Sequence, residues 1–180
     1  RSVNFSNDFI MEKLESRGLR VRLSPMTEWL NYCGYIGRRT RGGNRPADRF
    51  SDLLGHRIEA AAFAAMSPHL GWPVPPTIQE ALDAAGPYLS DALEGEAVLT
   101  VGAPLHAWQH RQIDAVVNVG PLECMPTKIA EAQLHHVAEQ HDLLSLTLSF
   151  NGDPINPAAL DNFAFEVKAR ARQRQQRSEL

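Results

Sequence analysis

The sequence predicts a mixed α/β fold in which a small parallel sheet is flanked by helices. Short apolar segments typical of strands alternate with longer segments that carry apolar residues at helical spacing. Candidate strands are followed three times by a proline at the start of a helix, at Pro25, Pro126 and Pro157. Strands and helices that alternate in this way form parallel sheets covered by helices.

The first third of the chain predicts a helix, a strand and a second helix. Residues 4–17 carry apolar side chains near helical spacing and end at a glycine. The segment LRVRLS, residues 19–24, alternates apolar and polar side chains as a half-buried strand does. Ser24 and Pro25 then predict the start of a helix through Tyr32.

The middle of the chain predicts further helices separated by breaks. The segment GRRTRGGNR, residues 37–45, has no apolar periodicity and predicts a loop. A long helix is expected over residues 47–66, and GWPVPP ends it. The segment TIQE matches a capping box and predicts a helix over residues 77–85, and a proline then starts a short helix over residues 87–93.

The second half supplies two of the expected strands. Residues 97–108 fit a strand or a helix, and the helix is favoured. The nearly continuous apolar segment DAVVNVG, residues 114–120, predicts a strand buried on both faces, followed by a helix over residues 126–140. The segment LLSLTLSF, residues 143–150, predicts a strand with one polar face, and Pro157 starts the last helix.

Composition limits the classes of protein. With 180 residues, 43% hydrophobic, we expect one domain over residues 1–180, a flavodoxin-like or Rossmann-like lobe. The net charge of -3 gives no field that would attract nucleic acid or a membrane surface, and neither partner is expected. With 2 Cys and no apolar run near the roughly 20 residues of a membrane span, a cytoplasmic location is predicted. Because the chain begins at Arg1 and ends in a basic, polar helix, it is expected to be the C-terminal fragment of a longer protein.

The corner around Cys124 is the candidate functional site. In GPLECMP, residues 120–126, the cysteine follows a predicted strand and precedes a predicted helix. Ligands of parallel sheets bind beyond the carboxyl ends of the strands, and a helix start stabilises negative charge. Ala130 stands where a phosphate-cradling cysteine loop needs arginine, and Thr127 stands where a dithiol pair needs cysteine. Three roles of Cys124 stay open at this point: a nucleophile, a metal ligand or an inert cysteine.

The same corner resembles a known family. GPLECMP is similar to GPFGCMP, a motif of the 2-hydroxyacyl-CoA dehydratase superfamily, in particular of the CoA enzyme activase proteins related to the activator of 2-hydroxyglutaryl-CoA dehydratase. The chain departs from that motif at Leu122 and Glu123, which replace Phe and Gly. Further similar segments follow the family's order: NDFIMEKLESRGL, PMTEWLNY, YLSDALEGEAVLTVG, LSLTLSFNGDP and NFAFEV.

The resemblance implies an iron–sulfur cluster and low-potential electron transfer for CoA-thioester or related reductive chemistry. Cys124 would be a cluster ligand, held by the rigid Pro121 and Pro126, and Gly120 would let the backbone pass close to the cluster. Since Cys33 is the only other cysteine, the remaining ligands are expected elsewhere in the parent chain, and the fragment alone is expected to be inactive and to bind no cluster. The expected partners are the parent's other domains, a dehydratase component or a CoA-type ligand.

Other residues suggest competing functions. The run Arg38–Arg45 suggests a metal-free binding or docking domain that recognises a CoA-like phosphate or a partner domain, because guanidinium groups match phosphate oxygens. A third hypothesis is a thiol enzyme with Cys124 as nucleophile. His106 and His110 have metal-ligand spacing on a helix, but surface or packing histidines are expected there.

Overall fold

The computed structural model describes the backbone of residues 4–41 and 46–178 and the side chains of residues 7–40, 54–55 and 57–176. The chain folds as two compact units. Unit 1 consists of residues 1–24 and 108–180, and unit 2 of residues 25–107. The described residues form helices and a two-stranded parallel sheet, which confirms the predicted fold class. The expectation of one domain over the whole chain stays a prediction.

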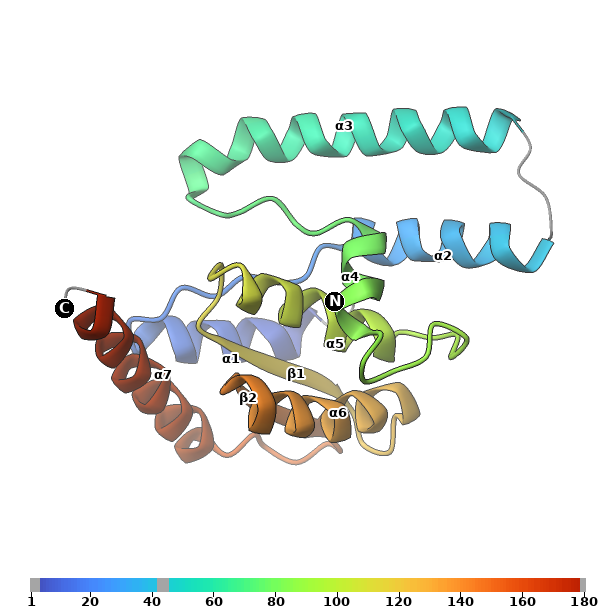
Figure 1. Ribbon diagram of the computed structural model, residues 1–180. Coiled ribbons are helices and arrows are strands. Elements are labelled where there is room, and N and C mark those ends of the chain that lie inside the picture. Colours follow the sequence, from blue (N-terminus) through green and yellow to red (C-terminus); the bar gives the residue numbers. More distant parts are fainter. Residues whose placement is uncertain (1–3, 42–45, 179–180) are drawn as a thin grey trace. The chain divides into compact units, whose positions relative to one another are not determined.

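Unit 1 is built around a strand–helix–strand motif. Strand β1 (Ala115–Pro121) pairs in parallel with β2 (Leu144–Phe150), with Ala115 opposite Leu144 and Pro121 opposite Phe150. Parallel neighbours need a crossover connection, and helix α6 (Met125–His141) supplies it, as Figure 1 shows. Both strands and this helix match the predicted elements within two residues at each end.

One face of the sheet carries one hydrophobic core cluster of unit 1. Helices α1 (Asn4–Ser16) and α7 (Pro157–Ser178) cover this face. Because side chains alternate across a strand, every second residue of β1 and β2 contacts these helices. Buried residues of the core are Ile10, Leu14, Leu160, Phe163, Ala164 and Val167. A fully buried leucine stabilises a fold by about 2 kcal/mol, so this cluster contributes to the stability of unit 1.

The other face of the sheet packs against α6. Asn118 is buried there, and its Nδ2 donates to Thr127 O at 3.3 Å and to Thr147 Oγ1 at 3.4 Å. The expected burial of β1 on both faces is only partly met, because most of its residues are half-buried. At the far end of α6, the indole Nε1 of Trp108 donates to His141 O at 2.9 Å, and the Arg174 guanidinium lies 4.6 Å from the centre of the indole ring.

Unit 2 is helical in its described part. Its helices are α2 (Met26–Arg41), α3 (Pro46–Leu70), α4 (Ile78–Ala85) and most of α5 (Ala97–Gln109). Helices α4 and α5 lie close together at Gly102, where a Cβ atom would overlap the carbonyl oxygen of Ala81. The helix favoured over residues 97–108 is confirmed, and most of its side chains are buried.

The capping box at the start of α4 is confirmed. Glu80 N donates to Thr77 Oγ1 at 3.3 Å, and Thr77 N donates to Glu80 Oε2 at 2.7 Å. These two bonds satisfy amide groups that have no partner within the helix. The pattern was readable from the sequence because both of its residues lie within one helical turn.

Three expected elements differ from the structure. Residues 19–24 form no strand, and although Leu19 and Val21 pack on the core of unit 1, their backbone pairs with neither strand. Residues 37–41 belong to α2 instead of a loop, because the helix continues past Tyr32, and residues 42–45 lie outside the described part. Residues 87–93 form turns instead of a helix.

Candidate functional site

The candidate site is the corner where β1 leads into α6. Beyond the end of β1, Leu122 N still donates to Phe150 O at 2.8 Å, so the chain stays attached to β2. Cys124 N then donates to Pro121 O at 3.2 Å, and Cys124 O accepts from Lys128 N at 2.9 Å. The backbone of the corner is therefore fixed on both sides of the cysteine.

Cys124 occupies the N-cap position of α6, with its side chain partly exposed. An N-cap side chain often accepts a hydrogen bond from the helix, but that of Cys124 makes no such bond. Pro126 lies in the first turn of the helix, as expected. The thiol therefore lies at the carboxyl end of a parallel strand without a capping role, which is the location that the sequence predicts.

Gly120 has a packing role at this corner. A Cβ atom on Gly120 would overlap the side chain of Thr127, which is buried in the first turn of α6. The missing side chain thus lets α6 lie close against β1. The expected role of Gly120 beside a cluster stays a prediction, and so does the expected role of the exposed Pro121.

Glu123 adopts a backbone conformation that favours glycine. Its φ angle is 61°, in the left-handed region where a side chain costs about 1–2 kcal/mol. The motif GPFGCMP has its second glycine at this position. Glu123 therefore occupies a position where its side chain causes strain that glycine would avoid.

Exposed apolar side chains flank the cysteine. Leu122 is 53% exposed and Met125 is 71% exposed. Single exposed apolar residues are common on protein surfaces, but two of them beside one thiol form a small apolar area.

The described residues contain no ready set of metal ligands. No group of three or more His, Cys, Asp or Glu side chains in the described part of the chain is placed to hold a metal ion. Cys33 is exposed on α2 in unit 2. The described residues by themselves therefore do not form a complete cluster site.

The histidine pair is not arranged as a helical metal site. His106 lies in α5, whereas His110 lies in the turn after this helix has ended. In α6, the exposed imidazoles of His135 and His136 lie 3.6 Å and 3.7 Å from carboxylate oxygens of Glu139. These contacts are typical of a solvated helix surface.

The arginine run is divided between described and undescribed residues. Arg38 and Arg39 lie on α2, the side chain of Arg41 is not described, and Arg45 lies outside the described residues. Arg39 Nη1 lies 2.7 Å from Asp91 Oδ2, and this pairing raises the pKa of Arg39 through a hydrogen bond and through charge. A phosphate at this position would have to compete with Asp91.

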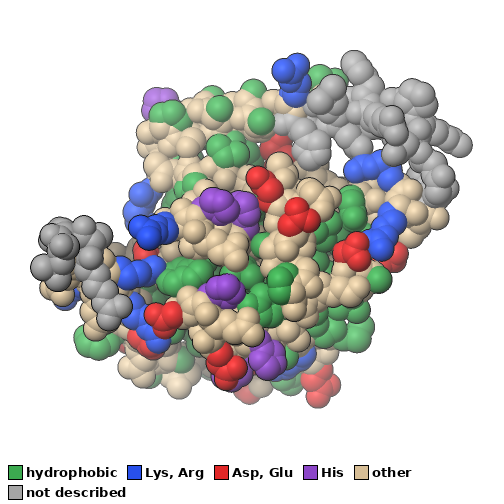
Figure 2. All heavy atoms as spheres, in the orientation of Figure 1, with side chains coloured by type: hydrophobic (Ala, Val, Ile, Leu, Met, Phe, Trp, Pro, Cys, Tyr) green, Lys and Arg blue, Asp and Glu red, His purple; other side chains and the backbone are tan. Residues whose placement is uncertain are grey.

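The basic end of α7 is partly neutralised by acidic residues. Arg170 pairs with Asp142 at 2.6 Å and with Glu166 at 2.8 Å, and Arg174 pairs with Asp114 at 2.8 Å. Figure 2 shows acidic and basic side chains side by side on the visible part of unit 1. In the described part of the chain, no helix is long and apolar enough to cross a membrane.

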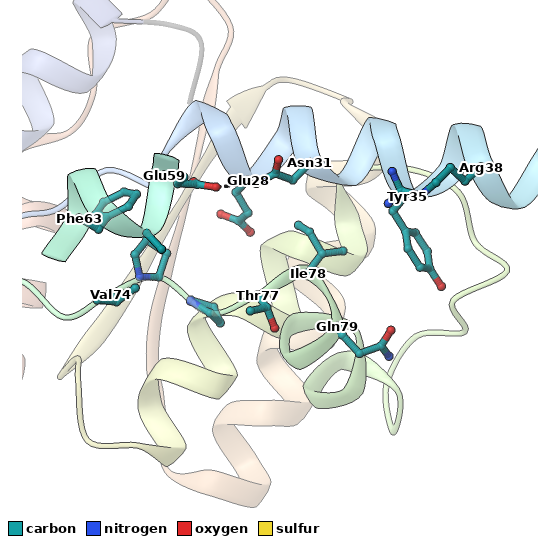
Figure 3. A pocket seen from close by; sticks show the side chains of 13 residues that line it. Glu28, Asn31, Tyr35, Arg38, Glu59, Phe63, Val74, Thr77, Ile78 and Gln79 are labelled. Carbon is teal, nitrogen blue, oxygen red and sulfur yellow. Dashed lines mark hydrogen bonds between the residues drawn. The ribbon is translucent and has the colours of Figure 1, made fainter. Parts of the chain in front are cut away.

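Unit 2 contains a pocket that sequence reasoning missed. It has a volume of about 390 Å³ and lies between one face of α2, part of α3 and the segment before α4, as Figure 3 shows. Its lining includes the carboxylates of Glu28 and Glu59 and the aromatic rings of Tyr35 and Phe63. The sequence gives no clear signal for this pocket, because glutamate is rarely buried and the burial of Glu28 is known only from the structure.

Comparisons of the chain with protein-family models, with curated proteins and with solved structures found no match. The resemblance of GPLECMP to the activase motif therefore stays a prediction.

Proposed function

We propose that the Cys124 corner supplies one cysteine ligand to an iron–sulfur cluster, in a protein related to the activator of 2-hydroxyglutaryl-CoA dehydratase. The remaining ligands come from outside the described residues. When bound, the cluster provides low-potential electrons for CoA-thioester or related reductive chemistry.

The observation that carries this proposal is the position of the Cys124 thiol. It is partly exposed, makes no capping hydrogen bond and lies on a backbone that is anchored to β2 and α6. A ligand shared between domains needs these properties, because it must be accessible from outside and must keep its direction. The exposed Leu122 and Met125 add an apolar surface on which a second domain can pack.

The other residues of the corner have supporting roles. The fixed φ angles of Pro121 and Pro126 limit the movement of the cysteine. Amide groups in the first turn of α6 have no partner within the helix, and amide donors of this kind can bond to sulfur and tune its electronic properties. The left-handed φ angle of Glu123 supports the resemblance to the activase motif, which has glycine there.

The alternative function, recognition of a CoA-like phosphate by Arg38–Arg45, has weaker support. Arg39 already pairs with Asp91 across 2.7 Å, and a phosphate clamp requires guanidinium groups that are available.

The test is the metal content of the complete protein, as its cells make it, after anaerobic purification. Iron and acid-labile sulfide are measured in the natural protein and in the variants Cys124→Ser and Cys33→Ser, together with their visible absorption spectra. We expect iron and sulfide in the natural protein and in Cys33→Ser, and a loss of both in Cys124→Ser.

Two results would contradict the proposal. The first is a natural protein without iron after anaerobic purification. The second is a Cys124→Ser variant that keeps the iron and the spectrum of the natural protein. The circular dichroism of each variant serves as the control for folding, so that loss of iron is not confused with loss of structure.

A further inference from the structure

Helix α7 of unit 1 carries a hollow on one face. The hollow has a volume of about 400 Å³, and Arg17, which follows the end of α1, lines one side of it. The helix contributes residues that are three and four positions apart and therefore lie on the same face. These residues are Asp161, Ala164, Phe165, Lys168, Ala169 and Arg172. The whole hollow belongs to unit 1.

The apolar part of the hollow is centred on Phe165. Its side chain is 77% exposed, the highest value among the large hydrophobic side chains of the described residues. Ala164 beside it is buried, and Ala169 is half-buried one turn further along the helix. An exposed aromatic ring above small buried residues leaves an apolar surface in water, and covering that surface is favourable.

The charged part of the hollow is positive. Among the described residues that line it, Asp161 is the single acidic one, and its carboxylate is shared by Arg17 at 2.8 Å and Lys13 at 3.3 Å. Lys168 Nζ donates to Arg17 O at 3.0 Å, but a backbone carbonyl leaves the charge in place and an ammonium group has two further donors. In the described part of the chain, neither Lys168 nor the exposed Arg172 forms an ion pair.

The two kinds of side chain form two parallel rows. Phe165 and Ala169 make the apolar row, and Lys168 and Arg172 make the basic row. Within each row the residues are four positions apart, which is about 6 Å along a helix. Side chains on one side of an extended peptide are about 6.6 Å apart and alternate with those on the other side. An extended peptide can therefore place one set of side chains along each row.

The length of the hollow also fits a peptide. From Asp161 to Arg172 the helix rises by about 16 Å, which corresponds to about five extended residues. A single inorganic anion would pair with one or two cations and would leave Phe165 in water. A segment that carries both acidic and apolar side chains matches both rows.

We propose that this face of α7 binds an extended acidic segment of a partner protein in which acidic and large apolar residues alternate. The carboxylates pair with Lys168 and Arg172, and the apolar side chains cover Phe165 and Ala169. The proposal does not depend on the cluster proposed at Cys124, because no residue of the hollow belongs to that corner.

The experiment measures binding of acetyl-Glu-Leu-Glu-Leu-Glu-amide to the full chain by isothermal titration calorimetry at low salt. The first control peptide replaces each Glu by Gln and so removes the charge, and the second replaces each Leu by Ser and so removes the apolar side chains. We expect the acidic, apolar peptide to bind about tenfold more tightly than either control. Its affinity should also fall as salt is added, because exposed charges are screened.

The variants Lys168→Gln, Arg172→Gln and Phe165→Ser test the two rows. Each loss of a cation should weaken binding about threefold, and loss of the aromatic ring about tenfold. Arg57→Gln is the matched control, since it removes the same charge from an exposed helical position in unit 2 and should leave the affinity unchanged. Circular dichroism checks the folding of each variant. Should Lys168→Gln fail to fold, Arg172→Gln decides, because Arg172 is exposed.

Several results would overturn the proposal. The uncharged peptide could bind as tightly as the acidic one, or the three variants could bind the acidic peptide as the natural chain does. Inorganic phosphate that binds as tightly as the acidic peptide, and equally well to Phe165→Ser, would assign the hollow to small anions. A chain that sediments as a dimer and becomes a monomer in Phe165→Ser would assign this face to a second copy.

Discussion

Each unit contains a glycine against which another element packs without room for a side chain, but the partner atoms differ. In unit 1, a Cβ atom on Gly120 would overlap the side chain of Thr127. In unit 2, a Cβ atom on Gly102 would overlap the backbone carbonyl of Ala81. A side chain can be removed by a second substitution, whereas a carbonyl group moves only with its helix. Two close contacts of similar appearance therefore differ in how well they tolerate change.

The largest effect is expected from Gly102→Ala in unit 2. The added methyl group forces α4 and α5 apart, and the free energy of unfolding should fall by about 3 kcal/mol or more. Chemical unfolding of the full chain, followed by circular dichroism, measures this loss. Gly55→Ala is the matched control, since nothing lies within 4 Å of its added methyl group and alanine favours a helix. Equal stability of the two variants would show that the α4–α5 contact is looser than described.

A smaller loss, about 1–3 kcal/mol, is expected from Gly120→Ala in unit 1. The double variant Gly120→Ala with Thr127→Ala should recover much of it, because the closest overlapping atom, Thr127 Oγ1, and Cγ2 are gone and only Cβ stays in close contact. Thr127→Ala alone is the control for a double-mutant cycle. If the losses of the two single variants simply add, the clash with Thr127 is not the reason for glycine at this position.

The two units also differ at the starts of their helices, because α4 in unit 2 has a capping box whereas the side chain of Cys124 at the start of α6 makes no capping bond. Thr77→Ala tests the capping box. This variant removes the side-chain acceptor of the capping box in unit 2 and should lower the free energy of unfolding by about 1 kcal/mol. Thr77→Ser keeps the acceptor and should stay close to the natural protein in the same unfolding experiment. A serine variant as unstable as the alanine variant would point to the lost methyl group instead.

Glu123→Gly tests the backbone of the Cys124 corner. Because glycine adopts the φ angle of 61° without steric cost, the variant should be more stable than the natural protein by up to about 1 kcal/mol. Glu123→Ala removes the same carboxylate but keeps the steric cost, so it should bring no gain. Thermal unfolding of the three proteins compares them. Equal gains in both variants would assign the effect to the lost charge.

The smallest effect is expected at the long-range contact of unit 1, where Asp161 on α7 meets Arg17. Their hydrogen bonds of 2.8 Å and 3.0 Å lower the pKa of Asp161, with a further contribution from Lys13. A lowered pKa in the folded state means that the carboxylate stabilises the fold above about pH 4 and that this contribution disappears as the pH falls.

Asp161→Asn should therefore be slightly less stable than the natural protein near neutral pH, and the difference should vanish in acid. Urea unfolding at several pH values measures it, with the exposed Asp8→Asn as the control. A difference that grows as the pH falls would contradict the direction of the pKa shift.

Much of the fold was predictable because its signals are local. The strands of unit 1, helix α6 and the capping box at Thr77 depend on residues within a few positions of one another. Residues 19–24 were misassigned because alternating side chains need only an apolar surface on one side, whereas a strand also needs a partner for its backbone. Leu19 and Val21 have the surface, but their backbone does not join the sheet.

The two candidate sites also differ in whether their residues are close together in the sequence. The location of Cys124 at a strand end was predictable because the strand, the corner and Pro126 are contiguous in sequence. The pocket of unit 2 was not predictable, because Glu28 and Glu59 come from different helices and meet only through tertiary packing. The left-handed conformation of Glu123 was also hidden, since glutamate gives no sign of a positive φ angle.

The contacts of Trp108 provide an optical reporter for unit 1. Its indole is hydrogen-bonded to the end of α6 and lies beneath the Arg174 guanidinium of α7, whereas Trp29 and Trp72 belong to unit 2. A chain that keeps Trp108 and carries phenylalanine at the other two positions would emit light from unit 1 alone. Its emission would shift to longer wavelength when α7 separates from α6 and water reaches the ring, while the converse variant would follow unit 2. The melting of each unit can then be recorded in the same intact chain.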